Sequence, residues 1–438
     1  MHTKLTAVLH ATLLSAVLLL AACGGNTYSV GGTITGLTGT VVLQNNGSEV
    51  LTISVDGPFA FATQYTGGSD YKVTVLTQPA GQTCTISAGS GKVNSDIKSV
   101  VVTCVDNILP RYAYVANEGS NTVSQYTVGA NGVITPMAAA TVAAGTNPYS
   151  IAIDPKLKYI YVANSGSGNV SQYTVGNDGA LTEIATPVLA GTNPHAVSVN
   201  PKGKYVYVVN SGSNNISQYN IGTDGALAPM NVATVAAGTN PNFVAIDPLG
   251  KYAYVVNAGS SDISQYNIDA NNGALSVMGT TTVVAGTTPN SIIVDPSGKY
   301  VYVANSGSGN ISQYNIGSNG SLSYMSVPTI PAGTTPYAIT IDPDGQYVYV
   351  ANTGSNNVSQ FTIGKDGALA ATSPETISAG ANPHAISVDT SGKYVYVANY
   401  GNNTISQYSI GAGGLLKPNS TAATAVAGTN PIFVFTVQ

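Results

Sequence analysis

One motif recurs seven times along most of the chain, and it constrains the possible fold more than any other feature. It reads Tyr-Val-Ala-Asn or a close variant, and its closing asparagine falls at Asn117, Asn164, Asn210, Asn257, Asn305, Asn352 and Asn399. Successive copies lie 46 to 48 residues apart. A near-constant period of this length is typical of a β-propeller or a solenoid.

Each repeat unit contains four short β-rich runs joined by turn residues. In the unit 193–238 the first three runs span 196–199, 205–209 and 216–221, and a less regular fourth run ends at Val235. Pro201 and Gly203 between the first two runs are typical turn residues, because Pro fixes φ and Gly tolerates a positive φ. Helical repeats would show a 3.6-residue period, and a parallel β-helix would use shorter coils. Four strands followed by a step to the next unit indicate a propeller blade.

The two ends of the repeat region predict that the ring closes. An Asn-Pro or Thr-Pro pair precedes each first strand, with its proline at Pro148, Pro194, Pro241, Pro289, Pro336, Pro383 and Pro431. The chain enters the repeats on a second strand at 111–116 and leaves on a first strand at 433–437. Pairing these ends completes the seventh blade and removes exposed strand edges. We therefore predict an all-β chain with a closed seven-bladed β-propeller over 111–438.

Residues that repeat in every unit are expected to be structural. Each unit carries three aromatic residues, as at Tyr205, Tyr207 and Tyr219, and Phe361 replaces the third in the sixth unit. We expect their rings to pack between blades and their hydroxyls to bond to backbone. The aspartates of the Asp-Pro turns are expected to accept turn amides.

The N-terminus has the pattern of an export signal. Lys4 precedes a mostly apolar run at 5–20, followed by Leu20-Ala21-Ala22-Cys23. That tetrapeptide resembles the bacterial lipobox, which implies a signal peptide at 1–22 and a lipid on Cys23 that makes the membrane a partner. No aspartate follows the cysteine, which favours the outer membrane, on its periplasmic or surface side. An ordinary cleaved signal is the alternative. Residues 23–30 would form a tether.

A separate small domain is expected over 28–106, where the repeat is absent. β-rich runs at 40–43, 50–55, 71–76 and 99–104 suggest an immunoglobulin-like or transthyretin-like β-sandwich. Cys84 and Cys104 are an even pair in an exported chain, which predicts a disulfide. No His or Cys residues stand at metal-ligand spacing, so we expect neither a metal site nor a cofactor.

The composition argues against a nucleic-acid partner. Charged residues make up 8% of the chain, Arg111 is the only arginine, and the lysines are scattered along the sequence. A surface that binds nucleic acid needs clustered lysine and arginine to neutralise phosphates.

The Tyr-Val-Ala-Asn units, with Asp-Pro-x-Gly-Lys before them and Ser-Gln-Tyr after them, resemble the YVTN-type β-propeller repeats. They are also similar to the seven-bladed lactonase family, which includes bacterial 6-phosphogluconolactonases. This resemblance covers 111–438 and implies lactone hydrolysis as one possible activity. The sequence departs from it in two ways. A phosphorylated substrate favours arginine or clustered lysine in the pocket, and the sole arginine lies at the propeller entry. No Gly-x-Ser-x-Gly elbow is present.

The residue after each Asn/Thr-Pro pair differs between units and is expected to line the channel mouth. These seven positions are Tyr149, His195, Asn242, Asn290, Tyr337, His384 and Ile432. His195 and His384 are the histidines outside the signal segment and are candidate catalytic bases. Alternatively, both histidines are polar residues that only line the channel. Tyr149, Asn242, Asn290 and Tyr337 would line it too and are possible ligand contacts.

Three functions remain open at this point. The first is a surface or periplasmic module that binds a small molecule, glycan or protein. The second is a lactonase that uses His195 or His384. The third is a structural protein of the cell envelope.

Overall fold

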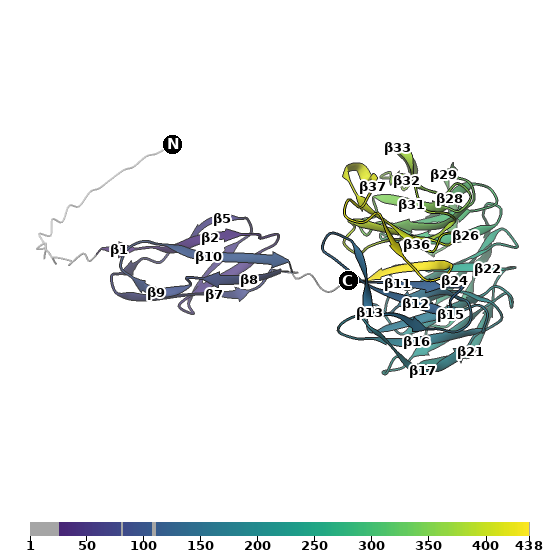
Figure 1. Cartoon of the computed structure of the whole chain (residues 1–438), viewed down its shortest axis with the longest axis horizontal. Coiled ribbons are helices and arrows are strands. Elements are labelled where there is room, and N and C mark those ends of the chain that lie inside the picture. Colours follow the sequence, from purple (N-terminus) through teal and green to yellow (C-terminus); the bar gives the residue numbers. More distant parts are fainter. Residues whose placement is uncertain (1–25, 80–81, 107–110, 438) are drawn as a thin grey trace, which may run out of the picture. The chain divides into compact units, whose positions relative to one another are not determined.

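The computed structural model describes residues 26–79, 82–106 and 111–437. The chain forms two compact units, 1–108 and 109–438, each described here by itself (Figure 1). The predicted signal peptide and Cys23 lie outside the described residues. Within the described ranges, no helix has the length and apolar character needed to span a bilayer.

The N-terminal unit contains two four-stranded sheets, with strand orders β5-β2-β10-β8 and β4-β3-β7-β9, and a β1-β6 pair. Its strands are β1 (Thr27–Tyr28), β2 (Val30–Thr35), β3 (Val41–Asn45), β4 (Glu49–Ile53), β5 (Gly57–Ala60), β6 (Tyr65–Thr66), β7 (Ser69–Thr77), β8 (Gln82–Ser87), β9 (Ser90–Val93) and β10 (Ile97–Asp106). β1 and the start of β2 lie inside the segment expected to be a tether.

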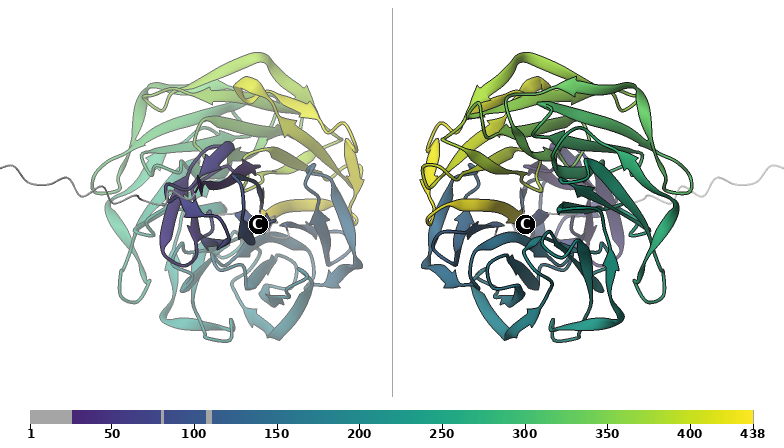
Figure 2. Two further views of the ribbon diagram at one scale, coloured as in Figure 1. Left: turned by 90° about the vertical axis from the view of Figure 1, so that its left-hand side faces the viewer. Right: turned by 90° about the vertical axis from the view of Figure 1, so that its right-hand side faces the viewer.

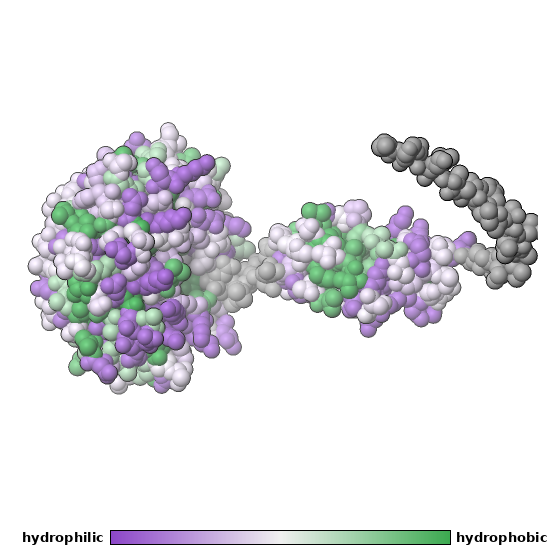
Figure 3. Space-filling view, turned by 180° about the vertical axis from the view of Figure 1, so that it is seen from behind, coloured by the Kyte–Doolittle hydropathy of each residue, from purple (hydrophilic) through white to green (hydrophobic). Residues whose placement is uncertain are grey.

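Both sheets of this unit contribute to one apolar core, which includes Ile34, Leu43, Val73 and Val102. Cys84 on β8 and Cys104 on β10 lie opposite each other in register and are joined by a disulfide. Figure 3 also shows hydrophobic residues on the surface of this unit. The exposed large apolar side chains are Val50, Val55, Leu76, Val101 and Val105. The sandwich class of this unit stays a prediction.

The second unit is the predicted propeller, and its seven sheets surround one central axis (Figure 2). The strands of each blade follow from the innermost outward. Blade one contains β39 (Pro431–Val437), β11 (Arg111–Asn117), β12 (Thr122–Val128) and β13 (Ile134–Ala143). Blade two contains β14 (Pro148–Ile153), β15 (Tyr159–Asn164), β16 (Asn169–Val175) and β17 (Leu181–Leu189). Blade three contains β18 (Pro194–Val199), β19 (Tyr205–Asn210), β20 (Asn215–Ile221) and β21 (Leu227–Ala236).

The remaining blades follow the same order. Blade four contains β22 (Pro241–Ile246), β23 (Tyr252–Asn257), β24 (Asp262–Ile268) and β25 (Leu275–Val284). Blade five contains β26 (Pro289–Val294), β27 (Tyr300–Asn305), β28 (Asn310–Ile316) and β29 (Leu322–Pro331). Blade six contains β30 (Pro336–Ile341), β31 (Tyr347–Asn352), β32 (Asn357–Ile363) and β33 (Leu369–Ser378). Blade seven contains β34 (Pro383–Val388), β35 (Tyr394–Asn399) and β36 (Thr404–Ile410), a 3-10 turn at Ala412–Gly414, and an outer edge split into β37 (Leu416–Pro418) and β38 (Thr424–Val426).

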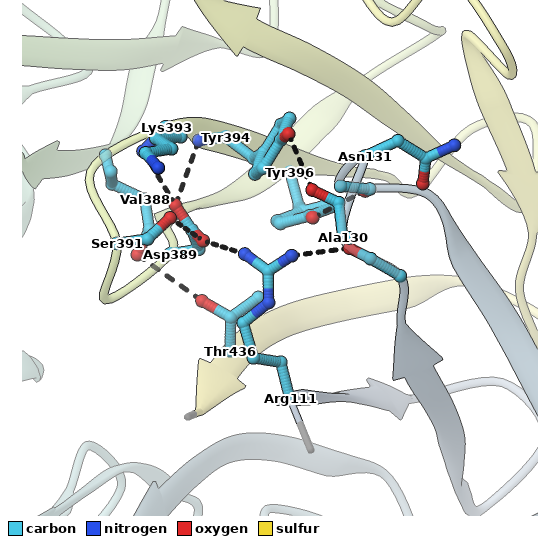
Figure 4. Close-up of polar contacts among 12 residues, drawn as sticks. Arg111, Ala130, Asn131, Val388, Asp389, Ser391, Lys393, Tyr394, Tyr396 and Thr436 are labelled. Carbon is cyan, nitrogen blue, oxygen red and sulfur yellow. Dashed lines mark hydrogen bonds and ion pairs between the residues drawn. The ribbon is translucent and has the colours of Figure 1, made fainter. Parts of the chain in front are cut away.

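The ring closes as the sequence predicts, because β39 pairs antiparallel with β11. A buried ion pair ties this first blade to the seventh (Figure 4). Arg111 Nη1 donates to Asp389 Oδ2 at 2.9 Å, and Arg111 Nη2 donates to the carbonyl of Gly129. The single arginine of the chain therefore holds the closing blade to its neighbour.

Two repeated hydrogen bonds join every blade to the next. In the first, the hydroxyl of the second tyrosine on each blade's second strand donates to a glycine carbonyl of the following blade, as Tyr254 does to Gly320. Its seven donors are Tyr114, Tyr161, Tyr207, Tyr254, Tyr302, Tyr349 and Tyr396. In the second, the glutamine of each Ser-Gln-aromatic element accepts a backbone amide of the following blade, as Gln125 does from Leu181. Both series return to blade one, from Tyr396 to Gly132 and from Ile134 to Gln407.

The repeated turns are also structural, as expected. Asp154 accepts backbone amides from Lys156, Lys158 and Tyr159. These bonds fix the turn between the first and second strands of the blade, and equivalent bonds form at Asp247 and Asp295. The carboxylates of these turns are therefore used by the fold.

Candidate functional site

The seven predicted channel residues are brought together around one cavity at one end of the propeller. We call this the mouth end; the innermost strands begin there. In every blade the predicted residue is skipped in the pairing of the first two strands. Pro148 pairs with Asn164 and Ser150 with Ala163, which leaves Tyr149 as a β-bulge. The other bulged residues are His195, Asn242, Asn290, Tyr337, His384 and Ile432. A bulge re-aims a side chain, and all seven side chains line the cavity.

A hydrogen bond crosses the channel and divides this ring. The hydroxyl oxygens of Tyr149 in blade two and Tyr337 in blade six lie 2.5 Å apart. Burial, followed by the charge of the partner hydroxyl, raises the pKa of Tyr149 well above its usual value. Both phenols are therefore neutral at physiological pH. Blades three to five lie on one side of this tyrosine bridge in ring order, and blades seven and one lie on the other.

The first arc is a chain of uncharged groups. Asn242 Nδ2 donates to Asn290 Oδ1 at 2.8 Å, so Asn242 Oδ1 remains to face His195 Nδ1 at 3.2 Å. With the amide oriented in this way, the proton of a neutral His195 is on Nδ1 and the lone pair is on Nε2. The His195 ring stacks on Tyr149 with centroids 4.3 Å apart. Burial lowers the pKa of His195 and so favours this neutral form.

The second arc places His384 between two tyrosines. Its ring centroid lies 4.5 Å from that of Tyr337 and 4.6 Å from that of Tyr400. His384 Nδ1 donates to the carbonyl of Asn382 at 3.0 Å, which again leaves the Nε2 lone pair free. Burial lowers the pKa of His384, and the bond to Asn382 and the charge of Glu118 offset part of this shift. The two histidines therefore have equivalent tautomers but different surroundings.

Glu118 and Tyr400 belong to the site and were missed by sequence reasoning. They follow Asn117 and Asn399, at a position that is Ser, Ala or Thr in the other five blades. Burial, followed by the charge of Glu118, raises the pKa of Tyr400. Their loops are also tied together, because Glu118 donates its amide to Asn430 and the Asn430 side chain donates to the Tyr400 carbonyl. The departure from the repeat in these two adjacent blades was the available signal.

An apolar floor lies below the ring. Phe243 of blade four and Phe433 of blade one approach across the channel, with ring centroids 6.5 Å apart. Ala338, Ile339 and Ile386 also line the cavity. The resulting cavity has a volume of about 80 Å³. It is polar at the mouth and apolar beneath, which suits a small ring with hydroxyl groups on one side.

Positive charge is concentrated at the opposite end of the propeller. All nine lysines in 111–437 lie in or beside the turns between the first and second or third and fourth strands, and all are exposed. They are Lys156, Lys158, Lys202, Lys204, Lys251, Lys299, Lys365, Lys393 and Lys417. Arg111 begins β11 at that end too and is buried. The described part of the propeller therefore has no lysine or arginine at the mouth. Nor does any described segment bring together three or more potential metal-ligating side chains.

The family model for the seven-bladed β-propeller lactonases matches residues 107–375 and 357–432. A proposed 6-phosphogluconolactonase of Bacteroides uniformis is 21% identical with a TM-score of 0.67, over 75% of this chain and 100% of its own. A second proposed 6-phosphogluconolactonase, of Bacteroides fragilis, is 23% identical with a TM-score of 0.67, over 76% and 99%. The periplasmic gluconolactonase of Pseudomonas aeruginosa is 21% identical with a TM-score of 0.64, over 75% and 99%.

These structural similarities establish the fold, and no curated protein matches the sequence. The family model spans more than half of the chain. The chain belongs to the seven-bladed β-propeller lactonase family.

Proposed function

We propose that this protein hydrolyses a lactone without a phosphate group at the mouth of its propeller channel, with His384 as the general base. The observation that carries the proposal is the environment of His384, whose Nδ1 is held by Asn382 while Nε2 is free. Family membership supports the reaction class. The similar periplasmic gluconolactonase acts, by its name, on a lactone without phosphate.

His384 can act as a base because its imidazole is neutral at physiological pH. In the proposed reaction, Nε2 takes a proton from a water molecule as the water oxygen attacks the lactone carbonyl carbon. The ring C–O bond then breaks, and the imidazolium returns the proton to the leaving alkoxide. The product is an open hydroxy acid, which ionises to a carboxylate. Glu118 stabilises the transient imidazolium because its charge raises the pKa of His384.

The tyrosine bridge supplies a donor for the carbonyl oxygen. Tyr149 and Tyr337 have two hydroxyl protons between them, and their mutual hydrogen bond uses one. The other is free to donate to an oxyanion in the transition state. Removing one such donor typically slows a reaction by about 10²- to 10³-fold.

His384 is the better base on the basis of charge. His195 is equally free at Nε2, but its hydrogen-bond partner Asn242 is uncharged and is bonded in turn to the uncharged Asn290. A neutral surrounding does little to stabilise an imidazolium. We propose that His195 orients the substrate by hydrogen bonding.

The test is hydrolysis of a panel of γ- and δ-lactones of sugars, each with and without phosphate. We expect turnover of the neutral lactones only, with a loss of about 10²-fold or more in His384→Gln and a smaller loss in His195→Gln. Glu375→Gln, on the exposed outermost strand β33, is the matched control and should stay near wild type. Faster turnover of the phosphorylated lactones, or full activity of His384→Gln, would contradict the proposal.

A binding module without turnover is the second candidate, supported by the hydrogen-bonded Asn242–Asn290 chain, which offers amide groups to a polar ligand. Its signature would be a sugar or lactone that binds the ring with no hydrolysis across the panel. Loss of that binding in Asn242→Ala would locate the ligand on the first arc.

We further propose that the protein is an exported lipoprotein of the cell envelope, anchored through Cys23. The resemblance of Leu20 to Cys23 to a lipobox supports this. Mass spectrometry of the mature N-terminus would detect an acylated Cys23, and Cys23→Ser should release the protein from the membrane fraction. An unmodified mature N-terminus beyond residue 23 would contradict the anchor.

A further inference from the structure

We infer that Glu118 makes the channel mouth selective against anions, so that the site takes uncharged ligands and expels a carboxylate product. This deepens the proposed function and rests on it for the identity of the product. The exclusion of anions is a property of binding and is tested by binding alone.

Glu118 lies at the rim of the channel mouth. Glu118 is placed at the rim by its own backbone, which donates to Asn430 and accepts from the Asn147 side chain. In blade seven the equivalent residue is Tyr400, whose ring packs on His384 and whose carbonyl accepts from the side chain of the same Asn430. Glu118 therefore occupies in blade one the rim position that in blade seven contacts the ring.

The charge of Glu118 acts on several residues of the ring. Among the causes that shift the pKa values of Tyr149, Tyr337 and His384 is the charge of Glu118. These side chains come from three different blades, so the field of one carboxylate covers both the tyrosine bridge and the second arc. At the mouth of the described propeller no lysine or arginine offsets this field.

The product of the proposed reaction differs from the substrate in charge. Opening a lactone converts a neutral ring into a carboxylate. A second anion placed beside Glu118 in a partly buried site is repelled, whereas the neutral substrate is not. Charge repulsion thus separates substrate from product, although the two molecules have almost the same atoms.

The experiment compares two probes that differ mainly in charge. D-glucitol is an uncharged polyol, and D-gluconate is the matching sugar acid. Titration calorimetry of the full chain measures the dissociation constant of each for the wild type, Glu118→Gln, Glu118→Lys and Glu375→Gln. The last is the matched control, because Glu375 is an exposed glutamate on the outermost strand β33.

We expect the wild type and Glu375→Gln to bind glucitol about tenfold or more tightly than gluconate at low salt. Glu118→Gln should bind the two probes within about threefold, and Glu118→Lys should prefer gluconate. The preference of the wild type should shrink near 1 M salt, where the screening length is about 3 Å. Equal affinities in the wild type, an unchanged ratio in Glu118→Gln, or no binding of either probe to any variant would overturn the inference.

The two proposals fail in different ways. If the ratio depends on Glu118 but no lactone is turned over, the proposed hydrolysis is wrong and the anion filter stands. If lactones are hydrolysed but the ratio is the same in Glu118→Gln, the filter is wrong and the hydrolysis stands. For an active enzyme, the inhibition constant of gluconate should also fall about tenfold in Glu118→Gln.

Discussion

Replacing Arg111 with methionine should destabilise the propeller at its closing blade. Arg111 and Asp389 are almost completely buried, with side chains 7% and 3% exposed, and their charged atoms lie 2.9 Å apart. Methionine fills a similar length but leaves the Asp389 carboxylate buried without its cation. It also removes the donor to the Gly129 carbonyl.

The expected loss of stability depends on the hydrogen bonds that Asp389 keeps in the variant. Breaking a buried ion pair by removing one partner costs about 3–5 kcal/mol. Asp389 still accepts the backbone amides of Lys393 and Tyr394 and the hydroxyl of Ser391. These bonds place the cost at the low end, about 3 kcal/mol. With an unfolding entropy of about 2.1 cal/mol/K per residue, this corresponds to a Tm lower by about 4 °C for the propeller.

Thermal unfolding followed by circular dichroism measures this shift. Lys158→Met is the matched control, because it removes an exposed cation from a propeller turn and should change stability by less than about 0.5 kcal/mol. The double variant Arg111→Met/Asp389→Asn removes both charges and should recover part of the loss. An Arg111→Met variant with the Tm of the wild type, or a double variant no more stable than the single one, would refute the reasoning.

Three further predictions concern the blades and the histidines. Tyr254→Phe leaves the buried carbonyl of Gly320 without its donor, and chemical denaturation should show a loss of about 1–3 kcal/mol. Phe361→Tyr adds to blade six the hydroxyl that the other blades have; in blade seven the equivalent Tyr408 donates to the carbonyl of Ser378, the last residue of the preceding outer strand. The variant should gain about 1 kcal/mol, and a loss would show that the pocket has no room. Burial lowers the pKa of His195 and His384 below the usual 6.5, so the unfolded chain binds more protons and the free energy of unfolding should fall as pH drops below 6.5. A His195→Asn/His384→Asn variant should lose that part of the pH dependence, and an unchanged profile would contradict the neutral assignment.

The propeller was predictable because each blade repeats its own structural rules. Tyr161 and Asp154 have equivalents in other blades with the same hydrogen bonds, so a pattern read in one unit holds in the next. The ring positions were predictable for the same reason, since the bulge falls at one fixed place after each Asn/Thr-Pro pair. The closure between β39 and β11 was predictable because the repeat region begins with a second strand and ends with a first strand.

The internal arrangement of the site was less accessible. The bridge between Tyr149 and Tyr337 depends on two side chains meeting across the channel from blades far apart in the sequence. The Phe243–Phe433 contact in the floor likewise depends on side chains of distant blades meeting across the channel. Glu118, in contrast, departs from a repeated small residue and was visible in the sequence. The propeller lysines look scattered along the sequence, but they fall in or beside equivalent turns of the repeat. Those turns all lie at one end of the propeller.

A crystal structure of the protein bound to a lactam analogue of a neutral sugar lactone would show how the channel mouth holds a substrate, because the analogue resembles the lactone but resists hydrolysis. We expect the analogue at the channel mouth, with its carbonyl oxygen on the Tyr149–Tyr337 pair and the carbonyl carbon near His384 Nε2. An analogue bound at the lysine-bearing end, or at the mouth with its carbonyl turned away from His384, would contradict this expectation.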